Sequence, residues 1–507
     1  MSASKEKRDE KLARRQQALD EQTKKTRTFR RNAIIVVAIL VIALAVALVI
    51  NSDLFYTAFP AVTIGNTSYS AAETDVFFRS SYNSFYSTYA NYIYSLLGSD
   101  ADIDSYFKSF TGLDRSVALD EQQYNDDQTW ADYFMEQTIE NMKQVTALCD
   151  AAAAAGFATP QEVVDDVDSS IESLRSSAAL YGYSSLDQFL SLNYGKGVST
   201  KILRNMMLKM ETASHYSESV NDAREYTEEQ TEAYYQEHAD ELDVISHYYF
   251  LVSSSNSAFD ELETDEEKVA AAQAAAAEIA EAATLEDFLA ACTEYGSEPT
   301  LRNTSGESLV TGISEWLLSA DRKTGDHTAI DTDTGAYAVW YVDRDDNDYA
   351  VRSMRHILIM AEADEDGSYS DDAILAAKER IHEIETEWKE DPTEEHFAEL
   401  ANSYSEDSGS NTTGGLYEDI SKHQMVEAID NFLFNEGAKA GDTTVVEGDN
   451  GSYHGWHLVY YVGEGELART LLAEEPMREA AQTEWLEGLE AGYEAKTGNG
   501  LKYVQKS

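Results

Sequence analysis

The feature that most constrains this chain is an internal duplication in its second half. The run "VISHYYFLV" resembles "SMRHILIM", and aligning His247 with His356 sets an offset of 109 residues. At the same offset, "LEDFLAACTEYGSE" lies over "EEHFAELANSYSED". The other aligned positions are Phe288 with Phe397, Tyr295 with Tyr404, and Glu298 with Asp407. Four anchors at one offset indicate two copies of one folding unit.

The closing strands of the two copies match at a larger offset. "TGAYAVWYV" lies over "HGWHLVYYV", which places Tyr337 on His457 at an offset of 120. The second copy therefore carries eleven extra residues between Asp407 and its closing strand, and "GSNTTGGLYED" lies in that interval. We expect His247 to superpose on His356, Tyr337 on His457, and the extra residues to form one insertion at the rim of the second copy's groove.

The rest of the chain is predicted to be mainly helical. At 507 residues the chain is too long for one core, so we expect two to four domains. Residues 51–240 show helical apolar spacing, and Gly156 is placed to end one of these helices. Residues 465–507 predict a helix that breaks near Pro476 and packs on the first helical region.

Each copy contains a strand, helices and a final strand, so the fold class is α+β, with a helical domain before the copies. The predicted segments are a cytoplasmic basic segment (1–32), a transmembrane anchor (33–50), the helical domain (51–240), a degenerate first copy (241–345), a complete second copy (351–464) and a C-terminal helix (465–507).

Aromatic residues recur at steps of three and four in "FFRSSYNSFYSTYANYIYSLLG", so they share one helix face. One interpretation is ordinary core. The other is a tyrosine-lined cradle for extended polypeptide, because tyrosine offers apolar area and a hydrogen-bonding tip. The sequence leaves both open.

Charge and hydropathy separate the N-terminus from the remainder. The formal net charge is −55, but residues 1–32 carry a net +6 and the rest −61. Nucleic acid is therefore not an expected partner of the large part. The run "AIIVVAILVIALAVALVI" at 33–50 contains eighteen apolar residues, just enough to span a bilayer. Its basic flank predicts a cytoplasmic N-terminus and an extracytoplasmic bulk. A cleaved signal peptide is the less favoured alternative.

No cofactor or metal is expected. The two cysteines cannot form a disulfide scaffold for a chain of this length. Six of the ten histidines lie between 351 and 462, but without the spacing of a zinc site. "EADEDG" lacks the glutamate of a calcium loop. A triad of Ser452, His457 and Asp407 would lack a nucleophile elbow.

Four motifs in order, "RHILI", "FAELANSYSEDSGS", "GGLYEDISKHQMV" and "GWHLVYYV", resemble the parvulin family of peptidyl-prolyl isomerases over residues 351–464. The whole chain resembles membrane-anchored extracytoplasmic foldases of the PrsA, SurA and PpiD type. The resemblance implies a polar floor under the prolyl bond, formed by His356, Asp407, Ser452 and His457.

The resemblance also implies an apolar pocket for the proline ring, in which Met425 supplies a flexible thioether. Two departures from the family concern this pocket: Tyr417 stands where leucine is common, and Ile420 and Ile429 stand where phenylalanine is. The implied pocket residues are Tyr417, Ile420, Met425, Ile429 and Phe434.

These features predict a bacterial foldase that isomerises X-Pro bonds in newly exported, unfolded polypeptides and also acts as a chaperone. The alternatives are a non-catalytic holdase of the same fold and a structural or assembly protein of the envelope. The first copy keeps His247 but has Tyr337, Glu298 and no Gly-Gly-to-Met segment, so we expect it to be inactive. The sequence does not indicate an oligomeric state.

Overall fold

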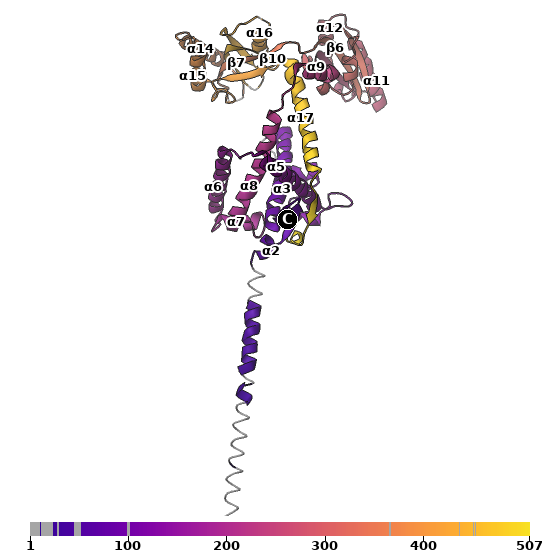
Figure 1. Ribbon diagram of the computed structural model, residues 1–507. Coiled ribbons are helices and arrows are strands. Elements are labelled where there is room, and N and C mark those ends of the chain that lie inside the picture. The colour runs from indigo at the N-terminus through magenta and orange to yellow at the C-terminus, as the bar shows by residue number, and fades with distance from the viewer. Residues whose placement is uncertain are drawn as a thin grey trace, which may run out of the picture. The chain divides into compact units, whose positions relative to one another are not determined.

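The computed structural model describes residue 11 and the ranges 24–27, 30–44, 52–98, 102–364, 367–435, 437–449, 451 and 453–506 (Figure 1). It forms two compact units. Unit 1 contains residues up to 224 together with residues from 481 onward, and unit 2 contains residues 225–480. Unit 2 is thus inserted in the sequence of unit 1, and the division falls at 224 where the sequence suggested 240.

Residues 30–44 are helical, and their side chains are exposed. The predicted anchor at 33–50 is therefore helical as far as residue 44, and residues 45–50 lie outside the described residues. Among the residues that the structure describes, no helix is long and apolar enough to cross a membrane.

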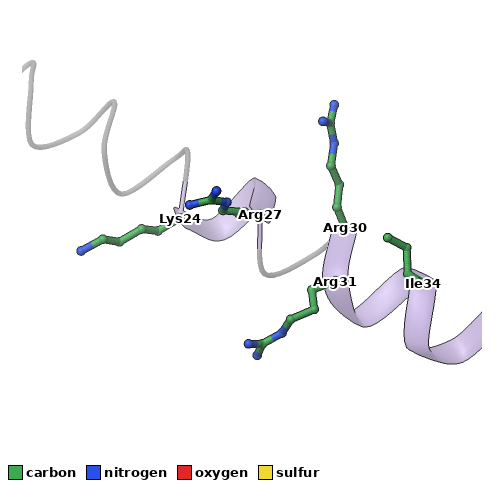
Figure 2. A pocket seen from close by; sticks show the side chains of 5 residues that line it. All are labelled: Lys24, Arg27, Arg30, Arg31 and Ile34. Atoms are coloured by element: carbon green, nitrogen blue, oxygen red, sulfur yellow. The ribbon is translucent and has the colours of Figure 1, made fainter.

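The basic flank lines a hollow of about 640 Å³ beside this helix. Figure 2 shows that the long side chains there point in different directions and do not converge on one point. This arrangement is typical of a solvated basic segment, not of a binding site. The lining residues are Lys24, Arg27, Arg30, Arg31 and Ile34.

Unit 1 is a helical bundle with a small sheet. Capping boxes start its two longest helices, with Ser70 and Glu73 at one and Thr129 and Asp132 at the other. Gly156, at φ 71°, ends the second of these as the sequence predicts. The helices are α2 (Leu54–Thr57), α3 (Ala71–Leu97), α4 (Ile103–Thr111), α5 (Trp130–Ala155), α6 (Gln161–Leu180), α7 (Leu186–Asn193) and α8 (Thr200–Asp222), with 3-10 turns η1 (Leu119–Glu121) and η4 (Leu501–Tyr503).

The aromatic stripe of α3 divides between the two interpretations. Phe85 packs at ring distances of 5.5 Å from Trp130 and 5.3 Å from Phe134, within the core. Farther along α3, Tyr92 is 51% exposed and meets Phe110 edge to face. The first part of the stripe is therefore core, and its end lies on the surface.

The C-terminal residues complete unit 1. β11 (Ala495–Thr497) pairs antiparallel with β1 (Pro60–Ile64), which also pairs with β2 (Thr67–Ser70). α17 (Ala468–Glu490) brings apolar side chains onto the unit 1 core, and it continues through Pro476. The predicted break there is wrong: proline removes one backbone donor, but the helix is continuous on both sides of it.

Unit 2 contains the two copies, preceded by α9 (Glu228–Glu237) and α10 (Ala239–Leu242). Both copies have a four-stranded antiparallel sheet with the same strand order, β4-β3-β6-β5 and β8-β7-β10-β9. The first copy comprises β3 (Val244–Ser253), η2 (Ser257–Phe259), α11 (Asp265–Ile279), α12 (Leu285–Cys292), β4 (Arg302–Ser305), η3 (Gly306–Ser308), α13 (Ser314–Leu317), β5 (His327–Thr332) and β6 (Gly335–Asp345). The second comprises β7 (Ala350–Met360), α14 (Asp371–Trp388), α15 (Glu394–Tyr404), β8 (Leu416–Ile420), α16 (Glu427–Phe434), β9 (Thr443–Asp449) and β10 (His454–Leu467).

Equivalent aromatic contacts pack α12 and α15 onto the sheets of the two copies. Phe288 meets Trp340 at 5.5 Å in the first copy, and Phe397 meets Tyr460 at 5.4 Å in the second. Phe288 and Phe397 are fully buried. Trp340 and Tyr460 are 120 residues apart, which is the offset that places Tyr337 on His457.

The extra residues of the second copy do not form one insertion. Leu285 and Glu394, which start equivalent helices, are 109 residues apart. The starts of β4 and β8 are 114 apart, and the starts of β5 and β9 are 116 apart. α16 is also longer than α13. The expected single insertion is therefore wrong, because the second copy lengthens several connections and one helix.

The strand register of the second copy places its two histidines together. In the ladder between β7 and β10, His356 lies opposite Val459 and His457 lies opposite Leu358. His457 is thus two residues from Val459, the partner of His356, and His356 is two residues from Leu358, the partner of His457. Side chains two residues apart share a face of a strand, so both imidazoles project from the same face of the sheet.

The register of the first copy corrects one predicted correspondence. His247 lies opposite Tyr341, four residues beyond Tyr337, whereas Tyr249 lies opposite Val339, two residues beyond Tyr337. Only Tyr249 reproduces the two-residue step of the histidines. The rings of Tyr249 and Tyr337 are 5.9 Å apart, close to the spacing of the histidine rings. Tyr249, not His247, therefore takes the place of His356.

Candidate active site

His356 and His457 form the centre of the site. Their rings are nearly parallel, at 15° and 5.4 Å between centroids, and their Nδ1 atoms are 3.2 Å apart. Both side chains are buried, with 7% and 3% of their surface exposed. Two buried imidazoles at this distance must share one proton between their facing nitrogens, so one ring donates and the other accepts.

Asp407 fixes which ring donates. It follows α15, and its Oδ2 lies 2.8 Å from His356 Nε2. The Ser410 hydroxyl and the Tyr417 hydroxyl also donate to Oδ2, the latter at 3.0 Å. The Gly409 N–H donates to Oδ1 at 3.2 Å. A carboxylate with this many donors is ionised and only accepts.

The hydrogen bonds therefore run in one direction toward Asp407. His356 donates Nε2–H to the carboxylate, so its Nδ1 accepts from His457 Nδ1–H. His457 Nε2 then accepts from the Tyr453 hydroxyl at 2.9 Å. The tautomer of each ring is assigned from this network. The result is a chain of Tyr453, His457, His356 and Asp407 with a charge at one end.

The electrostatics agree with this assignment. Burial, with a smaller contribution from the neighbouring His356, lowers the pKa of His457 to about 4 against the opposing effect of Asp407. Burial also lowers the pKa of His356, against the opposing effect of Asp407. For Asp407, burial acts to raise the pKa, but the hydrogen bonds from Ser410, His356 and Gly409 outweigh it and hold the pKa well below its usual range. At neutral pH both imidazoles are neutral beside an ionised carboxylate.

Glycines let the backbone approach both histidines. Gly415 has φ 71°, and a Cβ there would lie 2.2 Å from the His356 carbonyl oxygen. The His356 N–H donates to the Gly415 carbonyl at 2.8 Å. A Cβ at Gly448 would lie 2.6 Å from His457 Nε2. The Gly414-Gly415 pair of the sequence is thus needed for close strand approach, since both residues have positive φ.

An apolar cluster adjoins the polar chain, and the predicted pocket residues have unequal roles in it. Tyr417 and Met425 are half-buried members of this cluster. Ile420 and Ile429 are buried, at 0% and 2% exposure, so they form its floor. The half-buried Phe434 meets the ring of Tyr349 at 5.5 Å. Of the five predicted pocket residues, Tyr417, Met425 and Phe434 are therefore the partly exposed ones, and Phe434 lies against Tyr349.

Tyr417 connects the two parts of the site. Its hydroxyl donates to Asp407, its ring meets His356 edge to face at 5.3 Å, and it packs in the cluster of Met425. Burial and the Asp407 contact raise the pKa of the Tyr417 hydroxyl, so it remains a donor at neutral pH. The structure thus brings together His356, Asp407, His457, Tyr417 and Met425.

Three serine and tyrosine residues of the site remain to be described, one that the sequence predicts and two that it does not. Ser452 lies outside the described residues. Tyr453, next to it in sequence, supplies the hydroxyl on His457, and Ser410 supplies a hydroxyl on Asp407. The spacing of Ser410 three residues after an aspartate is a turn signal that could have identified it. No comparable signal marks Tyr453.

Among the residues that the structure describes, no group of three His, Cys, Asp or Glu side chains could hold a metal ion.

Comparison with known families decides the class of the second copy. The PPIC-type PPIase domain matches residues 340–462. This chain carries a parvulin-type rotamase domain. The enzyme class of this domain is peptidyl-prolyl cis–trans isomerase. The match contains all the site residues named above and excludes most of the first copy, which ends at Asp345.

Solved structures give a weaker likeness. The crystal structure of foldase protein PrsA from Streptococcus pneumoniae str. Canada MDR_19A is 10% identical, with 73% of this chain and 88% of that chain covered and a TM-score of 0.26. Peptidylprolyl isomerase (PrsA) from Bacillus anthracis is 13% identical, with 69% and 93% covered and a TM-score of 0.18. These TM-scores are too low to decide arrangement or activity. No curated protein matches the chain.

Proposed function

We propose that His356, Asp407 and His457, with Tyr417 and Tyr453, form the active site of an X-Pro isomerase that acts on unfolded polypeptides. The observation that carries this proposal is the one-directional hydrogen-bond chain beside the half-buried Met425. Isomerisation needs no nucleophile, because the barrier of about 18–20 kcal/mol comes from amide resonance. A site only has to grip the proline ring and favour the twisted amide over the planar one.

The geometry suits both tasks. Met425 and the ring of Tyr417 offer an apolar contact for the proline ring. The histidines are too buried to be the main contact surface, so their role is to hold the half-buried tyrosine hydroxyls and Asp407 in fixed directions. Dipoles that are already oriented cost little reorganisation when the amide twists, which is the principle of electrostatic preorganisation. A barrier lowered by about 4 kcal/mol gives roughly a thousandfold acceleration.

The test uses the full chain and a short Ala-Pro peptide, whose cis–trans exchange is followed by NMR. Uncatalysed exchange takes tens of seconds or longer, and the protein should accelerate it. His457→Ala should abolish most of the acceleration because it cuts the chain between His356 and Tyr453. Met425→Ala should weaken it by removing the apolar contact.

His454→Ala is the matched control. This histidine lies on the same strand three residues earlier, and it contacts Glu447 at the surface, away from the chain. It should leave the rate unchanged. If the full chain leaves the peptide at its uncatalysed rate, or if His457→Ala keeps the full rate, the assigned site is wrong.

A chaperone role is the second candidate, favoured by one observation. Apolar side chains at the ends of α3 and α4 are exposed, including Tyr92, Leu97 and Phe110 at 51%, 47% and 41%. Such surface suits extended, unfolded chains. Suppression of client aggregation should survive His457→Ala and should fall when Tyr92 and Phe110 are both changed to serine. Loss of suppression with His457→Ala would place both activities at the prolyl site.

We also propose that the chain is anchored in a bacterial membrane with its bulk outside the cytoplasm. The support is the eighteen-residue apolar run, its exposed apolar side chains on all sides of residues 34–44, and the basic flank. The protein should sediment with membranes, and protease added to spheroplasts should degrade residues 52 onward. Complete protection of these residues would reverse the orientation.

A further inference from the structure

The loop that carries Met425 is held by residues that precede the first strand of its own copy. Residues 421–426 join β8 to α16. The Lys422 N–H donates to the Tyr349 hydroxyl at 3.1 Å. Lys422 Nζ forms an ion pair with Asp345 at 2.6 Å and lies 4.1 Å from the centroid of the Tyr349 ring. Asp345 is the last residue of β6 in the first copy, so this loop is joined to the segment that connects the copies.

The other anchor of the loop comes from α16. His423 has a left-handed backbone, with φ 66°, and its N–H donates to the Asp430 carboxylate at 2.7 Å. Asp430 is buried in the first turns of α16. Met425 lies between this anchor and Val426, the residue directly before the first residue of α16. The backbone before Met425 is therefore fixed at Lys422 and His423, and a shift of either residue moves the methionine.

The Tyr349 end of the contact is rigid. The Tyr349 ring meets Phe434 edge to face at 5.5 Å. Its carbonyl accepts from the Ala468 N–H at 2.8 Å, at the start of α17. Asn347, just before it, donates to the Tyr235 hydroxyl and to the Leu242 carbonyl. A rigid anchor that meets a short loop determines the position of the loop, and not the reverse.

The first copy has the same kind of contact. There the Gly306 N–H, directly after β4, donates to the Asp243 carbonyl at 3.0 Å, directly before β3. The approach is close enough that a Cβ at Gly306 would lie 1.8 Å from the Asp240 carbonyl oxygen. In both copies, the segment before the first strand thus holds the loop after the second strand. In the second copy, that segment is the exit of the first copy.

We infer that Asp345 and Tyr349 are positioning residues for the prolyl site, and that through them the catalytically inactive first copy sets the affinity of the second for proline. The contact determines where Met425 lies over the apolar cluster. It does not touch the hydrogen-bond chain of the histidines. Its loss should therefore weaken substrate binding more than the rate of the bound substrate. The inference rests on the proposed function, in which Met425 contacts the proline ring.

The test compares Tyr349→Phe and Lys422→Met with wild type in the full chain. Tyr349→Phe removes only the hydroxyl, and Lys422→Met replaces the ammonium group with an uncharged side chain of similar length. KM and kcat come from the dependence of Ala-Pro peptide exchange on peptide concentration. Both variants should raise KM about threefold to tenfold and change kcat less than twofold. In protein labelled at methionine methyls, the Met425 signal, identified with Met425→Ala, should shift in both variants.

Lys389→Met is the matched control, because it removes an ion pair with Glu385 on α14 and leaves the loop untouched. It should reproduce the wild-type KM and the wild-type Met425 signal. Asp345→Asn should have little further effect in the Lys422→Met background, since both changes break one ion pair.

The outcomes separate the two claims. If wild type does not accelerate exchange, the proposed function fails, and the Met425 signal still reports whether the contact positions the loop. If wild type is active while Tyr349→Phe and Lys422→Met keep both its KM and its Met425 signal, the positioning inference is overturned.

Discussion

The two copies of unit 2 have the same sheet order and the same helix-packed core, and they differ in what stands on the opposite face. In the second copy, His356 and His457 meet there under Asp407. In the first, Tyr249 and Tyr337 occupy the equivalent places, with ring centroids 5.9 Å apart. A pair of neighbouring rings is retained, edge to face instead of nearly parallel, and the nitrogens that carry the hydrogen-bond chain are lost.

The difference shows that the scaffold does not need the polar chain in order to fold. Aromatic rings fill the same place in the first copy without buried charge, which avoids the cost of desolvating a carboxylate. In the second copy, four hydrogen bonds to the Asp407 carboxylate offset this desolvation cost. Polar groups retained at such a cost indicate a function beyond folding.

The largest effect that should separate the copies is on stability. Gly415→Ala should destabilise the second copy by about 3 kcal/mol or more, because a Cβ would overlap the His356 carbonyl and the backbone has positive φ. Gly437→Ala is the control: its φ of 68° is nearly the same, but open space surrounds it, so its cost should be about 1 kcal/mol. Urea unfolding measures the loss of stability in both variants. If the two losses are equal, close approach of the backbone is not what requires Gly415.

The next effect is on catalysis. Asp407→Asn should slow exchange of an Ala-Pro peptide about a hundredfold, near 3 kcal/mol, because an amide lacks the charge that orders the histidine tautomers. Glu298→Gln, at the aligned position of the first copy, should change nothing, since that side chain is exposed. A similar loss in both variants would mean that the first copy contributes to the reaction after all.

The smallest expected effect is on the pH dependence of stability. Burial lowers the pKa of His457 to about 4, against 6.5 in the unfolded chain. Between these values the unfolded state binds more protons, so stability is complete above pH 6.5 and is lost as pH falls toward 4, by at most about 3 kcal/mol.

His457→Phe should flatten this dependence in the second copy. His247→Phe offers the comparison in the first copy, where burial also lowers the pKa of a histidine whose Nδ1–H donates to the Ile245 carbonyl. Urea midpoints at pH 7.5 and 5.0 measure both. If His457→Phe leaves the pH dependence of stability unchanged, other groups cause that dependence.

Much of this architecture was predictable from the sequence, for a physical reason. Phe288 and Phe397 are fully buried on equivalent helices. A buried aromatic side chain has to keep its place in the core, so these two helices align at the offset of 109 residues. The strand alignment of His247 was wrong because a two-residue slip leaves every side chain on the same face. Only the register, which pairs His247 with Tyr341, distinguishes His247 from Tyr249.

The site was predictable in its charged centre and less so at its edges. His356, Asp407 and His457 come together as the resemblance implies, because motif and strand positions fix them. Ile420 and Ile429 are fully buried in the cluster, which depends on packing that residue spacing does not report. Tyr453 reaches His457 across a turn, so no periodicity could indicate it.

The pairing of β11 with β1 has a consequence for the order in which the protein is made. β1 begins at Pro60, and its partner begins at Ala495. A ribosome must therefore synthesise all of unit 2 before the small sheet of unit 1 can close. Every strand of the isomerase domain ends by Leu467, so its sheet can form during synthesis while the small sheet of unit 1 is still incomplete.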